Sequence, residues 1–297
     1  MPRSSQTSKK KEDAARKIRD YYVSREELSI LNEKLVRLNQ KLIDAEQMKS
    51  NFISNISNEI MNPFTSILGL SRNILEVKKE NWKKVIAMVA MIHSEAFNLD
   101  FQLKNIFAAA KIEAGEIFPE ISNVDVKSLI LDIVDGFKYE ARKKSLLIAC
   151  SFSNQNKEKQ YYFHSDAEKI GLIISNLLNN AIKFSKEKGK ILLNIRVKAD
   201  KLILSVQDFG KGISKKNQQI IFDRFNRTDS GISSVFRGHG LGLSINKAFI
   251  DILNGNCILM TATGKGTKFV VTLPRMEGEI EGITLEGNEL FFKEDLF

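Results

Sequence analysis

Residues 175–185 read SNLLNNAIKFS, and their pattern of apolar and polar residues predicts a helix that extends over about residues 166–184. On that helix Asn176 and Asn180 are four residues apart and share a face with Lys183, so two amides and an ammonium can face one triphosphate. An amide oxygen is a hard ligand that suits magnesium, and Lys183 offers positive charge to phosphate. The alternative is that these polar residues form the solvent-exposed face of an ordinary helix.

A glycine-rich segment, QDFGKGIS, follows at residues 207–214. Asp208 ends an expected strand, and Gly210 and Gly212 lie in a turn where the backbone has to approach a ligand closely. A carboxylate at this place can accept a hydrogen bond from the exocyclic amino group of adenine, which distinguishes adenine from guanine. A plain glycine-rich turn is the alternative. The letters DFG also match a protein-kinase signature, but no HRD catalytic loop or VAIK strand accompanies them, so we treat this match as chance.

Two further glycine clusters lie downstream. The first is RGHGLGLSI at residues 237–245, and the second is GKGT at residues 264–267, before the last expected strand. In the first cluster an expected helix begins among Gly238, Gly240, Leu241 and Gly242. Backbone N–H groups at such a helix start, together with the helix dipole, can hold phosphates. The GxGxG spacing differs from the dinucleotide pattern GxGxxG, and no GK[ST] follows as in a P-loop.

The order and separation of these four clusters, with IFDRFNR at residues 221–227 between the second and third, resemble a known set of motifs. They are similar to the N, G1, F, G2 and last-glycine boxes of the histidine-kinase ATPase domain, the GHKL or Bergerat fold shared with gyrase, Hsp90 and MutL. The resemblance covers about residues 124–274 and implies binding of ATP with Mg2+. It also implies that residues 226–239 form the mobile ATP lid.

The resemblance implies a role for individual residues. Asn180 would coordinate magnesium, and Asn176 and Lys183 would help to hold the phosphates. Phe184 would line the adenine site, and Asp208 would read adenine. The other residues implied to contact the nucleotide are Gly210, Gly212, Gly238, Gly240, Leu241, Gly242 and Thr267.

The first half of the chain carries long helical patterns. From Leu28 the apolar residues follow a three-four repeat with one miss at Lys49, which buries a seam between helices and predicts a coiled coil over residues 24–50. The helix is expected to continue through a kink at Asn62–Pro63 to about Glu76. A second helical pattern covers Trp82–Ala114, and Gly115 can end it with a left-handed cap. Two helices joined by a short turn cannot bury their apolar stripes alone, so we predict a homodimer that forms a four-helix bundle.

Residues 52–65, FISNISNEIMNPFT, resemble the phosphoacceptor box of HisKA-type histidine-kinase hairpins, whose usual centre is Ser-His-Glu. Here Asn58 stands at the histidine position. A neutral imidazole keeps a nitrogen lone pair, whereas the lone pair of an amide nitrogen is delocalised into its carbonyl, so Asn58 is not expected to become phosphorylated. The resemblance implies that Glu59 matches the general base of the kinase reaction. It also implies that Asn62 matches the residue that orients water to hydrolyse phospho-aspartate.

The pattern of apolar residues changes after about residue 123. Helices are expected near residues 124–142, 166–184 and 241–253, and strands near 146–152, 161–164, 190–198, 202–207, 257–263 and 267–273. This order predicts a multidomain chain in which a two-layer α/β sandwich follows the antiparallel helical hairpin. The expected parts are a basic disordered head at 1–23, the coiled coil at 24–50, the hairpin at 51–118, the ATP-binding domain at 119–275 and an acidic tail at 276–297.

Composition and charge weigh against some classes of function. The net charge of +9 is spread along the chain apart from the basic head and the acidic tail, so a solvated surface is expected rather than a nucleic-acid site. No run of about 18 to 20 apolar residues occurs, and the N-terminal residues lack the apolar segment of a secretory signal. A soluble, cytoplasmic protein without a membrane span is therefore expected.

The resemblance implies a signal-transduction protein of a two-component system, which binds Mg-ATP, forms a homodimer and docks the receiver domain of a response regulator. Its activity would be phosphatase-like or conformational, because Asn58 removes the usual autophosphorylation site. Two alternatives stay open. One is a non-catalytic pseudokinase scaffold that regulates a partner histidine kinase by heterodimerising. The other is an engineered variant in which asparagine replaces the histidine of an active kinase. Phosphorylation of serine or threonine on another protein is a further option, which the hairpin disfavours.

Overall fold

The computed structural model describes residues 31–40, 43, 46, 54, 57, 58, 60–78, 81–154, 161–218, 221–222 and 241–277. The chain divides into two compact units, Met1–Ser54 and Asn55–Phe297. In the first unit residues 31–40 are helical, and their leucines Leu31, Leu35 and Leu38 are exposed. These leucines have the spacing of the predicted coiled coil, and a partner helix for them stays a prediction.

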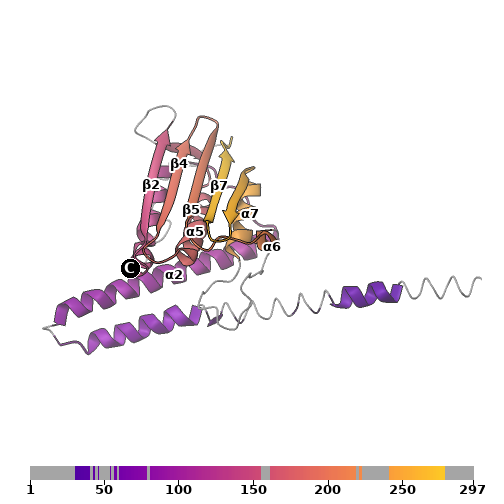
Figure 1. Ribbon diagram of the computed structural model, residues 1–297. Coiled ribbons are helices and arrows are strands. Elements are labelled where there is room, and N and C mark those ends of the chain that lie inside the picture. Colours follow the sequence, from indigo (N-terminus) through magenta and orange to yellow (C-terminus); the bar gives the residue numbers. More distant parts are fainter. Residues whose placement is uncertain are drawn as a thin grey trace, which may run out of the picture. The chain divides into compact units, whose positions relative to one another are not determined.

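In the second unit two helical segments run antiparallel beside each other (Figure 1). The first is formed by residues 60–75, and the second is α2, Trp82–Ala114. α2 ends at Gly115, whose φ of 69° is left-handed, and the N–H groups of Gly115 and Glu116 donate to carbonyls of the last helical turn. The predicted bounds of α2 and its glycine cap are therefore confirmed. None of the helices among the described residues has the length and apolar character needed to cross a membrane.

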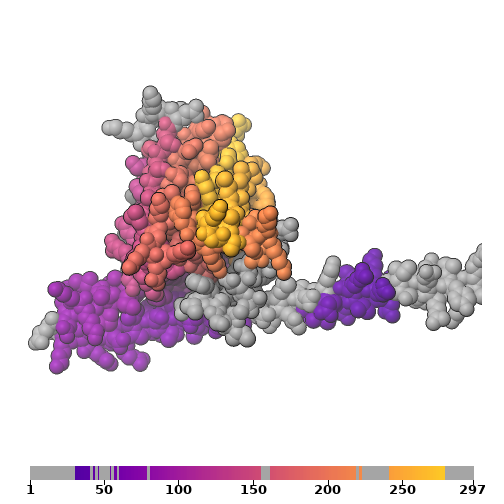
Figure 2. Space-filling model, viewed as in Figure 1, coloured from indigo at the N-terminus to yellow at the C-terminus, as the bar shows by residue number. Residues whose placement is uncertain are grey.

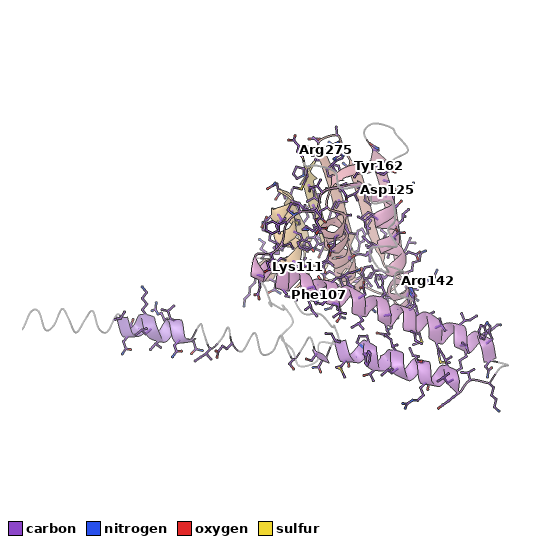
Figure 3. All side chains as sticks on the ribbon, turned by 180° about the vertical axis from the view of Figure 1, so that it is seen from behind. Phe107, Lys111, Asp125, Arg142, Tyr162 and Arg275 are labelled. Carbon is purple, nitrogen blue, oxygen red and sulfur yellow. The ribbon has the colours of Figure 1, made fainter. Side chains whose placement is uncertain are left out.

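Two sheets follow the hairpin. β1, Ser122–Asp125, pairs antiparallel with β3, Tyr162–Ser165, and Asp125 lies opposite Tyr162 in this ladder (Figure 3). The larger sheet contains, in spatial order, β2 (Leu147–Asn154), β4 (Lys190–Val197), β5 (Lys201–Asp208), β7 (Gly266–Pro274) and β6 (Asn256–Ala262). β2 and β4 are parallel, and the other pairs are antiparallel. Because a parallel pair needs a crossover, the chain between β2 and β4 contains β3 and the long helix α5.

Helices cover one face of the larger sheet (Figure 1). The central one is α5, Ala167–Phe184, which packs against β5 and contacts both α3, Val126–Gly136, and α7, Gly242–Ile252. Every residue of α5 from Lys169 to Leu178 is buried, because the sheet and the neighbouring helices surround it. On the other face, β4 and β7 reach the molecular surface (Figure 2). The predicted two-layer α/β sandwich is confirmed, and it follows a helical region as expected.

One predicted helix was wrong in its extent. A single helix was expected near residues 124–142, but the chain continues in strand β1 to Asp125, forms α3, and then forms the short α4, Lys138–Lys143. The Asp125 carboxylate accepts hydrogen bonds from two N–H groups in the first turn of α3, which starts the helix there. Phe137 separates α3 from α4. The short helix α6, Lys215–Gln218, was not expected.

An aromatic cluster packs the second half of α2 against the α/β layer. The ring of Phe137 meets Phe97 and Phe101 of α2 edge to face, at centroid distances of 5.1 and 5.7 Å. Gly136 leaves room for this contact, because a Cβ at that position would overlap the Phe97 ring. The break between α3 and α4 thus places a buried aromatic ring where α2 crosses.

We expect Phe97→Ala to lower the free energy of unfolding by about 3 kcal/mol, because it removes a buried ring and leaves a cavity against Phe137. Phe118 is the control, since its side chain is 74% exposed, and Phe118→Ala should change stability by less than about 0.5 kcal/mol. Urea denaturation followed by circular dichroism measures both variants. Equal effects would show that the cluster does not hold α2 in place.

Candidate functional site

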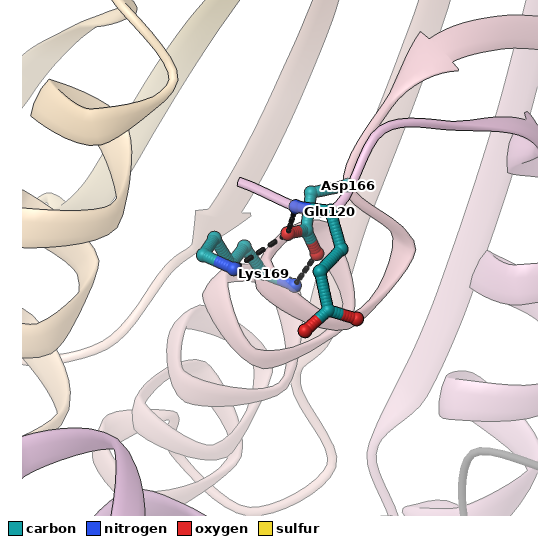
Figure 4. Close-up of polar contacts among 3 residues, drawn as sticks. All are labelled: Glu120, Asp166 and Lys169. Carbon is teal, nitrogen blue, oxygen red and sulfur yellow. Dashed lines mark hydrogen bonds and ion pairs between the residues drawn. The ribbon is translucent and has the colours of Figure 1, made fainter. Parts of the chain in front are cut away.

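A buried ion pair fixes the first turn of α5, the helix that carries four of the predicted nucleotide residues (Figure 4). The Asp166 carboxylate accepts a hydrogen bond from the Lys169 N–H, and the Lys169 ammonium lies 2.5 Å from the same carboxylate. The N–H of Glu120, in the segment between α2 and β1, donates to Asp166 Oδ2 at 2.8 Å. Lys169 Nζ is also 5.8 Å from the ring centroid of Phe249 on α7. Because both charges are buried, loss of either partner would leave the other uncompensated.

Asn176, further along α5, is tied to α7. Its Nδ2 donates to Asn246 Oδ1 at 3.0 Å, and Asn246 Nδ2 donates to the carbonyl of Ile173 at 3.1 Å. The two asparagines are 4% and 2% exposed. Gly242, the first residue of α7, lies against the Asn176 amide, and a Cβ at Gly242 would be 2.8 Å from Asn176 Oδ1. The structure therefore gives Asn176 a part in helix packing, and its contact with phosphates stays a prediction.

The last turns of α5 carry Asn180, Lys183 and Phe184, which are all half-buried. Two ammonium groups lie over the Phe184 ring, with Lys183 Nζ at 5.3 Å and Lys211 Nζ at 4.9 Å from its centroid. The end of α5 thus combines an aromatic ring, an amide and two positive charges. A nucleoside triphosphate requires this combination of an apolar surface for its base and positive charge for its phosphates.

The glycine-rich turn after β5 touches the end of α5 so closely that no side chain fits between them. A Cβ at Gly210 would overlap the carbonyl of Phe184, and one at Gly212 would overlap a carbonyl of β6. Gly266 approaches the Asp208 carbonyl in the same way. Gly212 and Gly266 also have φ angles of 65° and 84°, which favour glycine. The backbone packing itself therefore requires the glycines that the sequence pattern singled out here.

Asp208, the last residue of β5, is 7% exposed. Its Oδ1 accepts a hydrogen bond from the Gly210 N–H at 2.8 Å. Burial raises the pKa of the Asp208 carboxyl above its ordinary value, and hydrogen bonds from the N–H groups of Gly210 and Thr267 act in the opposite direction. A carboxylate has about four lone-pair positions, so Asp208 can hold this turn and also accept a ligand amino group.

Hydroxyl groups join the β6–β7 turn to the turn after β5. Thr261 Oγ1 accepts a hydrogen bond from the Ile213 N–H at 3.0 Å and donates to the first carbonyl of β7 at 2.9 Å. Thr267 Oγ1 lies 3.1 Å from the same hydroxyl. The Gly264 N–H donates to the Lys211 carbonyl at 2.7 Å. The second and fourth predicted clusters therefore lie next to each other in space.

Other predicted residues lie apart from this arrangement or outside the described residues. Leu241 is buried just before α7. Asn58 and Asn62 are exposed helical residues of the hairpin. The positions outside the described residues are Glu59, Gly238, Gly240 and the whole of the predicted lid at 226–239. Their roles stay predictions.

The sequence pattern did not point to Asn246 or to the pair of Asp166 and Lys169. Asn246 lies three residues before Phe249 on the buried face of α7. A polar residue on the apolar face of a helix needs a buried partner, and this signal could have identified Asn246. No comparable signal distinguished Lys169 from the other lysines of the chain.

The arrangement fits a magnesium ion that is held mainly by the nucleotide. Among the described residues, no group of three or more His, Cys, Asp or Glu side chains could hold a metal ion by itself. Mg2+ usually keeps several waters and binds substrate phosphates with only one or two protein ligands. The half-buried Asn180 amide, whose oxygen is a hard donor, is suited to be such a ligand.

We expect Gly210→Ala to lower the free energy of unfolding by about 2 kcal/mol, because the added methyl group would overlap the backbone carbonyl of Phe184. Gly69→Ala is the control. Gly69 lies in the helical segment 60–75, a Cβ there would meet no atom within 4 Å, and alanine should stabilise the helix by roughly 0.5–1 kcal/mol. Urea titration measures both. A Gly210→Ala protein as stable as the unmodified chain would contradict the close packing of this turn.

Comparison with known families and relatives gives consistent results. Residues 165–277 match the family described as histidine kinase-, DNA gyrase B-, and HSP90-like ATPase. The circadian input-output histidine kinase CikA of Thermosynechococcus vestitus is 28% identical over 234 residues, which are 77% of this chain and 31% of CikA. The sensor protein RprX of Bacteroides fragilis is 25% identical over 236 residues, which are 78% of this chain and 45% of RprX. The chain thus spans less than half the length of these relatives.

Among solved structures, full-length ShkA in complex with AMPPNP is similar to this chain with a TM-score of 0.52. The sequences are 21% identical, and the similarity covers 79% of this chain and 47% of ShkA. At this identity the comparison shows a shared fold and nothing about the ligand of this chain.

Proposed function

Because this chain is a relative of the sensor histidine kinases and carries their type of ATPase domain at residues 165–277, we propose that it binds Mg-ATP, forms a homodimer and docks a response-regulator receiver domain. The packing of the turn after β5 against the end of α5 is the observation that carries the nucleotide part. This packing places the Asp208 carboxylate and the backbone of Phe184 against the same turn, with no room for a larger residue at Gly210.

Each residue of this site binds a different part of the nucleotide. Asp208 accepts a hydrogen bond from the adenine amino group, and the Phe184 ring packs against the base. The Asn180 amide oxygen holds magnesium, and the Lys183 ammonium supplies positive charge to the phosphates. Asn176 keeps the start of α7 against α5, so that backbone N–H groups at the start of α7 can face the phosphates.

Asn58 determines which reactions the hairpin can carry out. Its amide nitrogen has no available lone pair, so it does not accept a phosphoryl group from ATP. Asn62, one turn further along the helix, is exposed and can orient water against the phospho-aspartate of a docked regulator. We therefore assign the chain a phosphatase-like or conformational activity in a two-component system. A nucleotide site beside a missing acceptor also supports the second candidate, a pseudokinase scaffold that regulates a partner histidine kinase.

Exposed apolar residues on the hairpin support the dimer. Four of them on each segment recur at helical spacing: Met61, Phe64, Leu68 and Leu75 on residues 60–75, and Trp82, Ile86, Val89 and Phe107 on α2. At 3.6 residues per turn each set lies along one side of its helix. In Figure 3, Phe107 lies on α2 close to Lys111, near the end of the helix. A single hairpin exposes this surface to water, whereas a four-helix bundle of two hairpins buries it.

We expect Asp208→Asn to weaken ATP binding about tenfold or more, because an amide cannot replace both acceptor oxygens of the carboxylate. Isothermal titration calorimetry with ATP and magnesium measures the affinity. Asp200→Asn is the control, since the Asp200 side chain is 71% exposed in the turn between β4 and β5.

The same titration has a predicted pH dependence. The ionised carboxylate accepts a stronger hydrogen bond from the adenine amino group than the protonated form does, and burial raises the Asp208 pKa. Affinity should therefore fall on acidification at a higher pH than an ordinary aspartate would give, and Asp208→Asn should remove this dependence. Unchanged affinity in Asp208→Asn would overturn the adenine assignment, and absence of ATP binding by the unmodified chain would overturn the proposed function.

We expect Asn58→His to restore autophosphorylation. The variant should incorporate label from γ-labelled ATP with magnesium in an acid-labile form, as phosphohistidine does, while the unmodified chain should incorporate none. Label on neither protein, with ATP binding intact, would favour the pseudokinase scaffold. Label on the unmodified chain would show that another residue accepts the phosphoryl group.

A further inference from the structure

Lys144 holds the carboxyl-terminal end of α5. Its Nζ donates to the backbone carbonyls of Ile182 at 2.9 Å and Lys183 at 2.7 Å. These carbonyls belong to the last helical turn, where no N–H group within the helix can satisfy them. A cation at this place also lies at the negative end of the helix dipole. The next carbonyl along the chain, that of Phe184, is the one that Gly210 approaches. Lys144 and the Gly210 turn thus contact three successive carbonyls.

The surrounding chain fixes the position of Lys144. Its backbone N–H donates to the Ala141 carbonyl at the end of α4, and its own carbonyl accepts a hydrogen bond from the Lys188 N–H at 3.0 Å. The side chain is half-buried. Burial lowers the pKa of the Lys144 ammonium, and the carboxylates of Glu187 and Glu140 act in the opposite direction. The two backbone hydrogen bonds, to Ala141 and from Lys188, connect Lys144 to both α4 and the loop after α5.

Glu140 links the same segment to the hairpin. Its Oε1 accepts hydrogen bonds from Ser94 Oγ at 3.3 Å and from Asn98 Nδ2 at 3.4 Å, and both donors belong to α2. Glu140 lies one helical turn before Lys144, and its negative charge favours the charged form of the Lys144 ammonium. α4 thus contacts α2 through Glu140, and Lys144, which follows α4, contacts the end of α5.

We propose that Lys144 is a positioning residue for the nucleotide: it holds the last turn of α5 so that Lys183 and Phe184 stay in place against the turn at Gly210. The proposal rests on the proposed function, because it concerns binding of the same nucleotide. Lys144 acts through the backbone of α5. Without its ammonium, two carbonyls lose their donors and the last turn can fray, which displaces the side chains that it carries.

The test compares Lys144→Met with Lys144→Arg by isothermal titration calorimetry with Mg-ATP. Methionine keeps the apolar stem but has no donor, so it should weaken ATP binding about tenfold. Arginine supplies N–H donors and should restore most of the affinity. Lys143→Met is the matched control, because Lys143 is the exposed last residue of α4 and its replacement should leave affinity unchanged.

Val197→Ala separates a positioning role from a general loss of stability. Val197 is buried in the last position of β4, at the other end of the strand from Lys190 and the site. Its replacement should lower stability but leave ATP affinity unchanged. Lys144→Gln, which keeps one donor group, serves in the same comparison if the methionine variant does not fold.

The outcomes distinguish this inference from the function on which it rests. Loss of affinity in Lys144→Met, recovery in Lys144→Arg and no loss in Val197→Ala would support the positioning role. If the unmodified chain binds ATP and Lys144→Met binds it equally well, the inference is wrong and the proposed function stands. Failure of arginine to restore binding, or an equal loss in Val197→Ala, would also overturn the inference. If the unmodified chain does not bind ATP, the proposed function itself is wrong.

Discussion

The nucleotide site depends on the contact between Gly210 and the backbone carbonyl of Phe184. No volume for a Cβ exists between them, so the separation of the β5 turn from the end of α5 is set by the two main chains. Asp208 lies two residues before this contact and hydrogen-bonds to the same turn, while Lys183 immediately precedes the carbonyl. The relative positions of Asp208, proposed to read the base, and of Lys183, proposed to bind phosphate, thus follow from backbone packing. A site positioned in this way is organised before its ligand arrives.

Buried or half-buried polar contacts hold α5 at three levels. Asp166 and Lys169 fix its first turn, the amide of Asn176 bonds across to Asn246 at mid-length, and Lys144 holds its last carbonyls. Apolar contacts with β5 and the neighbouring helices supply the larger part of the burial, but such contacts tolerate small sliding motions. A buried polar group that loses its partner costs free energy, so these contacts favour one register of the helix over its neighbours.

Features with local signals could be predicted from the sequence. The bounds of α2 follow from its apolar spacing and from Gly115, whose left-handed conformation ends the helix, and the β4–β5 hairpin follows from two apolar runs around a short polar turn. Features that depend on distant residues could not. The break between α3 and α4 at Phe137 is explained by the packing of its ring against Phe97, which lies on a different helix. Helical spacing placed Asn176 on the face of Asn180, but the partner that buries its amide is 70 residues away.

Two segments connected with α2 contact opposite ends of α5. One is the segment after α2, which contains Glu120, and the other is α4 with Lys144. At the first turn, the N–H of Glu120 donates to Asp166, and at the last turn Lys144 follows α4, whose Glu140 accepts hydrogen bonds from α2. Because α5 is bonded at both ends to groups connected with α2, the proposed nucleotide site and the hairpin are physically continuous. Coupling between two sites requires such continuity, but continuity does not measure the strength of coupling. Asn58 removes the phosphoryl acceptor but none of these contacts. The proposed conformational activity needs only these contacts, because it does not depend on a phosphoryl group at position 58.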